Sequence, residues 1–228
     1  MTAKLNEYQL KNGTVIDPSK IIAYFDFDGT LTRHDTLIHF VIYVSGILKF
    51  LVNSPILLII AILYFIRLIS NEKAKELFLT IMIRGVKKQK IDILAKRFAL
   101  SKLDKYIKPE IYTRLEYHLE HGHNVILVSA NLAIYLHYWA LKHHINGVIA
   151  TEIEFDQHDI ATGKLLTRNC YGEEKLKRIY DYLLSHKAEY IYSYGYGNSA
   201  GDYSLLKYVD EGYWIKGTDI ISWEEYSG

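Results

Sequence analysis

The stretch YFDFDGTLT, residues 24–32, places two aspartates one residue apart directly after an apolar run. The run IIAYF (21–25) does not alternate apolar and polar residues, which is typical of a strand buried on both faces of a parallel sheet. Asp26 and Asp28 would then lie at the carboxyl end of that strand, where open α/β sheets bind ligands. Gly29 permits a sharp turn there. Two acids this close repel each other unless a cation offsets their charge.

The rest of the chain alternates short apolar runs with helical stretches. We predict further strands at 124–129, 147–151, 189–195 and 212–215, and helices at 132–143, 172–185 and 201–208. This alternation predicts an α/β fold with a doubly wound, Rossmann-like parallel sheet. Residues 153–168 interrupt the alternation with two short segments around glycine and polar residues, which predicts a small β-hairpin.

A long helical segment separates the first two strands. Residues 35–109 carry no strand pattern, and the gap of roughly ninety residues is far more than one crossover helix requires. We therefore predict an inserted all-helical domain at 36–112, which would cap a core formed by 1–35 and 113–228.

Composition excludes several classes of protein. Half of the residues are hydrophobic and the net charge is +1, so we expect neither a disordered chain nor a nucleic-acid partner. The single cysteine, Cys170, allows no intrachain disulfide and no thiolate metal site. Residues 1–20 lack the apolar core of a secretory signal, which predicts a cytoplasmic protein.

Polar residues follow other predicted strands as well. The Ser129 hydroxyl, with the amides that begin at Ala130, can bind phosphate oxygens. Lys175 opens a helix three residues after Gly172, and GNSAGD (197–202) offers the side-chain oxygens of Asn198 and Asp202 to a cation such as Mg²⁺. Taken singly, each feature is equally a helix cap, a solvated lysine or a glycine-rich turn.

Together, and in this order, these segments closely resemble the four motifs of the haloacid dehalogenase superfamily of phosphohydrolases. DFDGT (26–30) is similar to the first motif, VILVSA (125–130) to the second, Lys175 to the third and GNSAGD to the fourth. The insert lies between the first and second motifs, as in the branch that contains phosphoserine phosphatase. The resemblance implies a helical cap on a Rossmann-like core and Mg²⁺-dependent hydrolysis of phosphomonoesters.

The resemblance also implies a role for each matched residue. Asp26 would attack phosphorus and form an aspartyl-phosphate, and Asp28 would serve as general acid and base. Phosphate would be held by Thr30, Ser129, Ala130 and Lys175, and Mg²⁺ by Asp26, Asp28, Asn198 and Asp202. Many members carry aspartate at the position of Asn198, so we expect weaker Mg²⁺ binding and a greater dependence on Asp202.

The insert is unusually apolar at its start. Lys49 is the only Lys, Arg, Asp or Glu between Asp35 and Arg67, and Asn53-Ser54-Pro55 predicts the turn of a helical hairpin within 40–69. Each arm is too short to span a membrane. We favour a dry core inside the cap over membrane contact or a dimer interface. The basic stretch 84–108 would support peripheral contact at the inner face of a membrane, or form a solvated helix face.

The substrate is left open between a small phosphorylated molecule and a phospholipid head group. The apolar cap is similar to that of bacterial phosphatidylglycerophosphate phosphatases of this superfamily. Asp35 stands where phosphoserine phosphatases place a glutamate for the substrate ammonium, but it also suits a helix N-cap, which we favour. The same residues would also suit a relative that binds phosphorylated ligands without turnover, or a phosphotransferase.

Three histidines precede the second strand. We expect His118, His121 and His123 to be cationic side chains at a helix C-terminus, at the end of the sheet opposite the site, and not a metal site.

Overall fold

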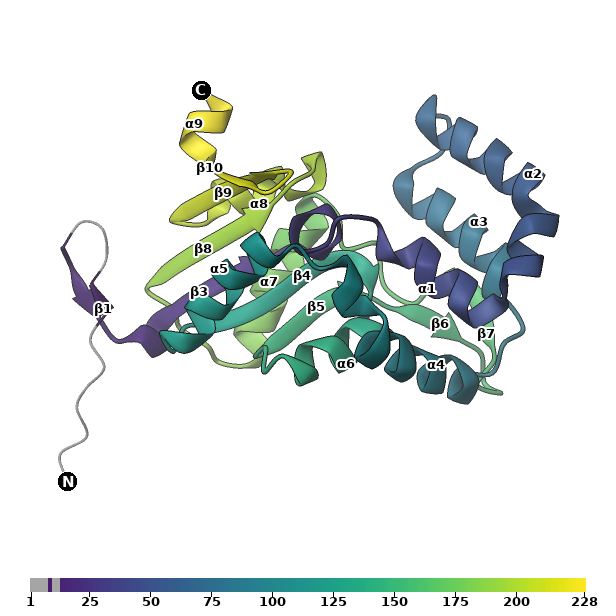
Figure 1. Cartoon of the computed structure of the whole chain (residues 1–228), viewed down its shortest axis with the longest axis horizontal. Coiled ribbons are helices and arrows are strands. Elements are labelled where there is room, and N and C mark those ends of the chain that lie inside the picture. The colour runs from purple at the N-terminus through teal and green to yellow at the C-terminus, as the bar shows by residue number, and fades with distance from the viewer. Residues whose placement is uncertain (1–7, 10–12) are drawn as a thin grey trace.

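A six-stranded sheet forms the centre of the molecule (Figure 1). The computed structural model describes residues 8–9 and 13–228, so part of the N-terminal segment 1–20 lies outside the described residues. The strands of the sheet are β3 (Ile21–Phe25), β4 (Asn124–Leu132), β5 (Gly147–Thr151), β8 (Tyr192–Gly197), β9 (Glu211–Lys216) and β10 (Asp219–Ser222). Their order is β10-β9-β8-β3-β4-β5, with β10 as an antiparallel edge and the others parallel.

Helices and two small hairpins surround the sheet. The helices are α1 (Thr36–Ser45), α2 (Ile47–Phe65), α3 (Asn71–Ile83), α4 (Lys88–Ser101), α5 (Pro109–Glu120), α6 (Ala133–Lys142), α7 (Glu173–Ser185), α8 (Tyr203–Tyr208) and α9 (Trp223–Ser227). Short helical turns are η1 (Pro18–Lys20), η2 (Phe27–Leu31), η3 (Leu103–Tyr106) and η4 (Ala200–Asp202). The hairpins pair β1 (Tyr8–Gln9) with β2 (Val15–Ile16), and β6 (Ile153–Phe155) with β7 (Ala161–Leu165).

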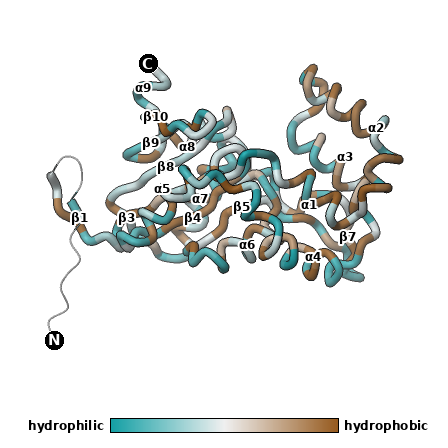
Figure 2. The backbone as a smooth tube through the Cα atoms, in the orientation of Figure 1, coloured by the Kyte–Doolittle hydropathy of each residue, from teal (hydrophilic) through white to brown (hydrophobic). Residues whose placement is uncertain are grey.

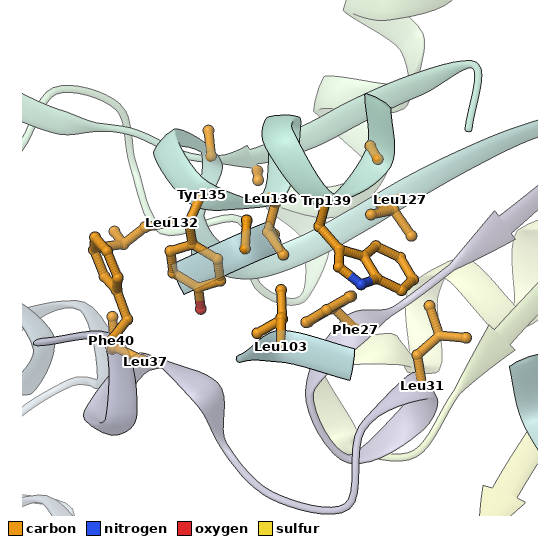
Figure 3. Close-up of a cluster of buried hydrophobic side chains, with 14 of the residues drawn as sticks. Phe27, Leu31, Leu37, Phe40, Leu103, Leu127, Leu132, Tyr135, Leu136 and Trp139 are labelled. Atoms are coloured by element: carbon orange, nitrogen blue, oxygen red, sulfur yellow. The ribbon is translucent and has the colours of Figure 1, made fainter. Parts of the chain in front are cut away.

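Apolar residues on both faces of β3 explain why the sheet is covered on both sides. Ile21, Ala23 and Phe25 join the larger core, to which α5 and α6 contribute. Ile22 and Tyr24 join a second core with residues of α7 and α8. Figure 3 shows part of the larger core, where side chains of α6 pack over β4 and η2. The doubly wound parallel sheet predicted from the sequence is confirmed.

The other predicted elements also form. The strand predicted at 147–151 coincides with β5, and the hairpin predicted within 153–168 is β6 and β7. The strand predicted at 189–195 begins later, at Tyr192. The edge strand β10 was not predicted.

The insert between β3 and β4 is helical, as expected. Its helix α1 packs against α3 and α4, and α3 lies against β7 of the hairpin. Helix α4 packs on α6 of the core as well. The division into a core (1–35 and 113–228) and a cap (36–112) therefore stays our proposal.

The prediction of a helical hairpin with a turn at 53–55 is wrong. Helix α1 ends at Ser45, Gly46 turns the chain with φ 89°, and α2 then runs without interruption through Pro55. Proline cannot donate to the carbonyl four residues earlier, which here is Leu51. The Ser54 hydroxyl donates to that carbonyl at 2.8 Å, so the helix continues without an unsatisfied oxygen.

Helix α2 is also exposed, contrary to the dry core that we favoured. By length and composition it could cross a membrane, and Ile60 is its only buried residue. Figure 2 shows it as an apolar segment at the edge of the molecule. The preceding α1 differs, since Phe40, Val41 and Val44 are buried in the larger core.

The basic stretch 84–108 covers α4. Figure 1 shows α4 beside α6 and apart from α2. The apolar helix and the basic helix therefore do not lie side by side, as a combined membrane anchor would require.

The prediction that the three histidines are cationic side chains at a helix C-terminus is wrong for two of them. His118 and His123 are buried, with their Nδ1 atoms 2.8 Å apart and His118 Nε2 2.8 Å from the Tyr196 hydroxyl. Burial lowers the pKa of His118 to about 2 and that of His123 to about 4, so both are neutral at pH 7. His121 is exposed, and its Nδ1 lies 2.7 Å from the Tyr117 carbonyl oxygen in the last turn of α5.

Candidate active site

Asp26 follows β3 directly, and its carboxylate is held between a lysine and a threonine. Its Oδ1 accepts a hydrogen bond from Lys175 Nζ at 2.7 Å, and its Oδ2 lies 2.9 Å from the Thr30 hydroxyl. Burial, reinforced by the Asp202 carboxylate and opposed by Lys175, raises the pKa of Asp26 to about 6. Asp26 is thus a buried carboxylate that is still mainly ionised at neutral pH.

Lys175 is fully buried and uses all three of its ammonium hydrogens. Its Nζ donates to Asp26, to Asp202 Oδ1 at 2.5 Å and to the Val128 carbonyl at 2.8 Å. Burial disfavours the charged form, but the two carboxylates outweigh it and raise the pKa of Lys175. The lysine therefore places a permanent positive charge beside Asp26.

Hydrogen-bond donors surround the Asp28 carboxylate, among them the Thr32 hydroxyl at 3.3 Å from Oδ1. Its Oδ1 accepts from the backbone N–H of Thr36 at 3.0 Å and from the Thr36 hydroxyl at 2.7 Å, and its Oδ2 accepts from Asn131 Nδ2. Burial, together with the nearby Asp35, nevertheless raises the pKa of Asp28 to about 7. A carboxyl group with this pKa can give and take a proton at neutral pH.

Gly29 brings the first motif against the fourth. Its φ is 80°, and a Cβ there would lie 2.3 Å from Asn198 Nδ2, so any other residue would be strained and would displace the Asn198 side chain. The Thr30 hydroxyl lies 3.0 Å from Asn198 Oδ1 as well as close to Asp26. Asn198 and Asp26 therefore present oxygens to one point, with Thr30 between them.

Both carboxylate oxygens of Asp202 are already engaged within the protein. Its Oδ1 accepts from Lys175, and its Oδ2 accepts from the backbone N–H groups of Asn198 and Ser199 and from the Ser199 hydroxyl. These contacts hold the turn η4 and fix Lys175. The role of Asp202 as a metal ligand stays a prediction, and the geometry favours a positioning role instead.

The second motif lies at the end of β4, next to the first. Ser129 is buried, and its Oγ accepts a hydrogen bond from the backbone N–H of Asn131 at 3.1 Å. Ser129, Ala130 and Asn131 all line the cavity that contains Asp26. Sequence reasoning missed Asn131, although SAN directly after an apolar strand could have suggested a residue that orients Asp28.

Lys75 was also missed, because it belongs to the insert and lies about fifty residues from the nearest motif. It reaches into the site from α3, where its Nζ donates to the Ala130 carbonyl at 2.5 Å and to Asn169 Oδ1 at 2.7 Å. Burial lowers the pKa of Lys75 to about 8, against the opposing effects of Asp35 and Asp28. The insert thus supplies a half-buried cation to the site.

Asn169 ties this helix to the core. Its backbone N–H donates to Glu72 Oε2 at 2.8 Å, and its Nδ2 donates to Asn71 Oδ1 at 2.6 Å. Its Oδ1 accepts from Lys75 and from the Thr151 hydroxyl. One buried asparagine therefore links the first turn of α3 to the loop before α7.

These residues surround a cavity of about 150 Å³. It is lined by Asp26, Asp28, Asp35, Leu37, Asn71, Lys75, Ser129, Ala130, Asn131, Tyr171, Lys175 and Ser199. Asp35 caps α1 by accepting from the backbone N–H of Leu37 at 2.8 Å, which is the N-cap geometry we favoured. The structure thus brings residues of all four motifs around one small polar cavity, the fourth through Ser199.

The donor set fits a hard divalent cation. Asp26 Oδ2 and Asn198 Oδ1 converge, and the carboxylates of Asp26, Asp28 and Asp202 outnumber the buried Lys175 in this part of the site. Mg²⁺ takes oxygen ligands and retains waters. Within residues 8–9 and 13–228 no three His, Cys, Asp or Glu side chains could hold a metal together. Binding would therefore depend on the Asn198 amide oxygen and on backbone oxygens.

A family comparison agrees with this arrangement of motifs. Residues 23–207 match the model of the haloacid dehalogenase-like hydrolase family. The chain belongs to the haloacid dehalogenase-like hydrolases. The predicted family and a hydrolytic enzyme are therefore confirmed. No curated protein matches the sequence.

Solved structures share the fold of this hydrolase at low sequence identity. A protein of unknown function from Bordetella pertussis Tohama I superposes with a TM-score of 0.71 at 20% identity, over 84% of this chain and 88% of that one. A probable phosphoserine phosphatase from Vibrio cholerae superposes with a TM-score of 0.61 at 12% identity, over 87% of this chain and 58% of that one. A phospho-aspartyl intermediate analogue of phosphoserine phosphatase gives 0.57 at 16% identity, over 84% of each chain.

Proposed function

We propose that this hydrolase is a Mg²⁺-dependent phosphatase that cleaves phosphomonoesters through an aspartyl-phosphate on Asp26. One observation carries the proposal: the Asp26 carboxylate faces a small polar cavity, fixed by Lys175 and Thr30, with the titratable Asp28 two residues away. The family supports a hydrolase. One structural neighbour is the solved structure of a phospho-aspartyl intermediate analogue of phosphoserine phosphatase.

In the first step, an oxygen of Asp26 attacks phosphorus while the bond from phosphorus to the ester oxygen breaks. Asp28 in its protonated form gives its proton to the departing oxygen. A pKa of about 7 keeps a substantial fraction of Asp28 protonated at neutral pH. Asn131 and Thr36 hold the Asp28 carboxyl group in place during this transfer.

In the second step, Asp28 takes a proton from a water that attacks the phosphorus. The bond between phosphorus and Asp26 breaks, which releases inorganic phosphate and restores both carboxyl groups. Ser129 and the amide of Ala130 would hold phosphoryl oxygens through both steps. Lys175 would neutralise charge on Asp26 and on the bound phosphoryl group.

Asp26, the backbone carbonyl of Asp28 and Asn198 would hold Mg²⁺. When bound, the ion neutralises phosphoryl charge and orients the phosphate for in-line attack. The roles of the individual residues, a cytoplasmic location and a peripheral membrane contact through the apolar helix α2, without the basic stretch 84–108, remain parts of this proposal.

Phosphoserine is a second candidate substrate. The catalytic cavity carries Asp35 and Lys75, whose opposite charges match the ammonium and carboxylate of an amino acid. Two features of the site count against this candidate. Asp35 already caps α1, and Lys75 already has two acceptors.

Release of phosphate from p-nitrophenyl phosphate, with Mg²⁺ or with EDTA, tests the reaction. We expect turnover only with Mg²⁺, and none in Asp26→Asn, in which the side chain keeps its size but loses its nucleophile. Acid quenching of Asp28→Asn with radiolabelled substrate should trap one hydroxylamine-sensitive phosphoryl group per chain. Turnover by Asp26→Asn would overturn the proposal. Binding without turnover by the wild type would indicate a relative that binds phosphorylated ligands without hydrolysing them. Label passing to an added alcohol would identify a phosphotransferase.

A further inference from the structure

A large apolar groove lies between α1, α2 and α3. Its volume is about 790 Å³, within the range of sites that bind ligands of drug size. The side chains of Ile38, Phe50, Leu57, Ile60, Ala61 and Phe78 line it. Nothing in the proposed reaction uses this groove.

The groove adjoins the catalytic cavity. Asp35, Leu37, Asn71 and Lys75 line both. The catalytic cavity is only about 150 Å³, which is enough for a phosphoryl group and little more. The rest of a substrate whose phosphate lies beside Asp26 must therefore lie outside this cavity, and the groove beyond these four residues is an apolar space into which it can extend.

Polarity changes sharply along this path. The charged side chains end at the junction, and the groove beyond them is lined mainly by aliphatic and aromatic groups, with Ser54 and Tyr64 as its polar residues. Lys49, the only Lys, Arg, Asp or Glu within 36–66, donates to the Met82 carbonyl at 2.7 Å, at the end of α3. The ammonium group of Lys49 is therefore bound at the C-terminus of α3, where a cation is stabilised. A ligand that matches this order has an anionic head and an apolar tail.

The outer face of α2 indicates where such a ligand would come from. Leu48, Val52, Ile59 and Phe65 do not line the groove, and between 56% and 86% of each is exposed. Contiguous apolar surface of this kind marks an interaction site and not an ordinary soluble surface. A helix that is apolar on its outer face and on its groove face suits contact with a lipid surface.

We propose that the enzyme acts on amphiphilic phosphomonoesters, with the phosphate in the catalytic cavity and the hydrocarbon tail in the groove between α1, α2 and α3. This inference rests on the proposed phosphatase function and narrows its substrate class. Lys75 and Asp35 would lie at the boundary between head and tail.

The test compares alkyl phosphates from butyl to dodecyl, each below its micelle concentration, by kcat/KM. Burial of a methylene favours transfer from water, so we expect kcat/KM to rise about two- to fourfold per added methylene until the groove is filled. Ala61→Trp places a large ring in the groove from an exposed position. It should reduce the advantage of dodecyl over butyl phosphate at least tenfold and leave butyl phosphate unaffected.

Ile59→Trp is the matched control, because Ile59 is an exposed residue of the same helix that does not line the groove. It should keep the chain-length dependence. Binding of the same series to Asp26→Asn, measured by calorimetry, separates this inference from the reaction itself. Tail-dependent binding that Ala61→Trp abolishes would support the groove even if no ester were hydrolysed.

Equal kcat/KM for all chain lengths would overturn the inference and leave the phosphatase function standing. Preference for phosphoserine over dodecyl phosphate would overturn it too. A dimer that buries α2, together with turnover independent of chain length, would assign the groove to a second copy of the chain and likewise reject the amphiphile.

Discussion

Gly29 and Asn198 meet in a contact that leaves no space for a further carbon atom. This contact joins the first motif to the fourth, and the alignment of Asp26 with Asn198 depends on it. A single added atom at this point would therefore move Asn198 away from Asp26, with which it is proposed to bind Mg²⁺.

We expect Gly29→Ala to lower phosphatase activity at least tenfold. The new methyl group would displace Asn198, in addition to the strain of about 1 kcal/mol that alanine suffers at positive φ. Gly85→Ala is the matched control, because Gly85 has φ 86° but no atom within 4 Å of the added carbon. Activity assays and urea unfolding of both variants check this. Equal activity in the two would show that the contact is not needed.

Asn198→Asp should lower the Mg²⁺ concentration required for half-maximal activity by about tenfold. A carboxylate adds negative charge where the amide oxygen of Asn198 faces Thr30 and Asp26. Titration of phosphate release with Mg²⁺ measures the change. Asn124→Asp, at the opposite end of β4, makes the same substitution far from the site and should have no effect. An unchanged Mg²⁺ requirement in Asn198→Asp would count against Asn198 as a ligand.

At the scale of elements, α3 is the part of the insert that enters the site. Its first turn bonds to Asn169 through Asn71, Glu72 and Lys75, and the same asparagine accepts from Thr151 of the sheet. Helix α2 packs on α3 and α1, and its polar attachments lead to α3: Lys49 donates to the Met82 carbonyl, and Asn71 donates to the Tyr64 hydroxyl. The polar cluster around Asn169 therefore fixes the first turns of α3, while packing on α1 and β7 holds the rest of that helix.

Asn169→Ala should reduce stability by about 2 kcal/mol and loosen α3. The substitution removes the side-chain bonds to Asn71, Lys75 and Thr151, although Lys75 and Thr151 each keep a bond to the Ala130 carbonyl. Urea unfolding gives the loss of stability, and amide hydrogen exchange in 71–76 should rise. Asn124→Ala removes one exposed bond to the Ser19 carbonyl and serves as the control. Protection of α3 equal to that of the wild type would show that packing alone holds the helix.

For the molecule as a whole, the end of the sheet opposite the site carries a buried pair of neutral histidines. The pKa values of His118 and His123 are both lowered, mainly by burial. Unfolding restores their ordinary pKa near 6.5, so the unfolded chain binds more protons than the folded one at mildly acidic pH. Stability linked to these residues is therefore fully present above about pH 6.5 and is lost as the pH falls below it.

The free energy of unfolding should fall by up to about 2 kcal/mol for His118 alone between pH 7 and pH 5. Urea unfolding across this range measures the slope. His118→Gln should flatten it, whereas His158→Gln, at an exposed position in the hairpin loop, should leave it unchanged. The same slope in all three proteins would mean that other groups cause the acid sensitivity.

The sequence by itself determined the central sheet, the β-hairpin of β6 and β7, and the position of Asp26 and Asp28 at the end of β3. Unalternating runs such as 21–25 can bury only between two helical layers, and the carboxyl ends of parallel strands must meet at one edge. Asp26, Asp28 and Ser129 were therefore predictable as neighbours from local patterns, whereas Lys175 was placed beside them by its resemblance to the third motif.

Only the tertiary structure decided the course of α2 and the contribution of the insert. Pro55 after asparagine and serine reads as a turn, but the Ser54 hydroxyl satisfies the carbonyl that proline leaves free. Lys75 and Asn131 become part of the site through contacts between residues 55 and 103 positions apart, which no local pattern encodes. The exposure of α2 likewise depends on what packs around it, because an apolar helix has the same composition whether it is buried in a core or faces outward.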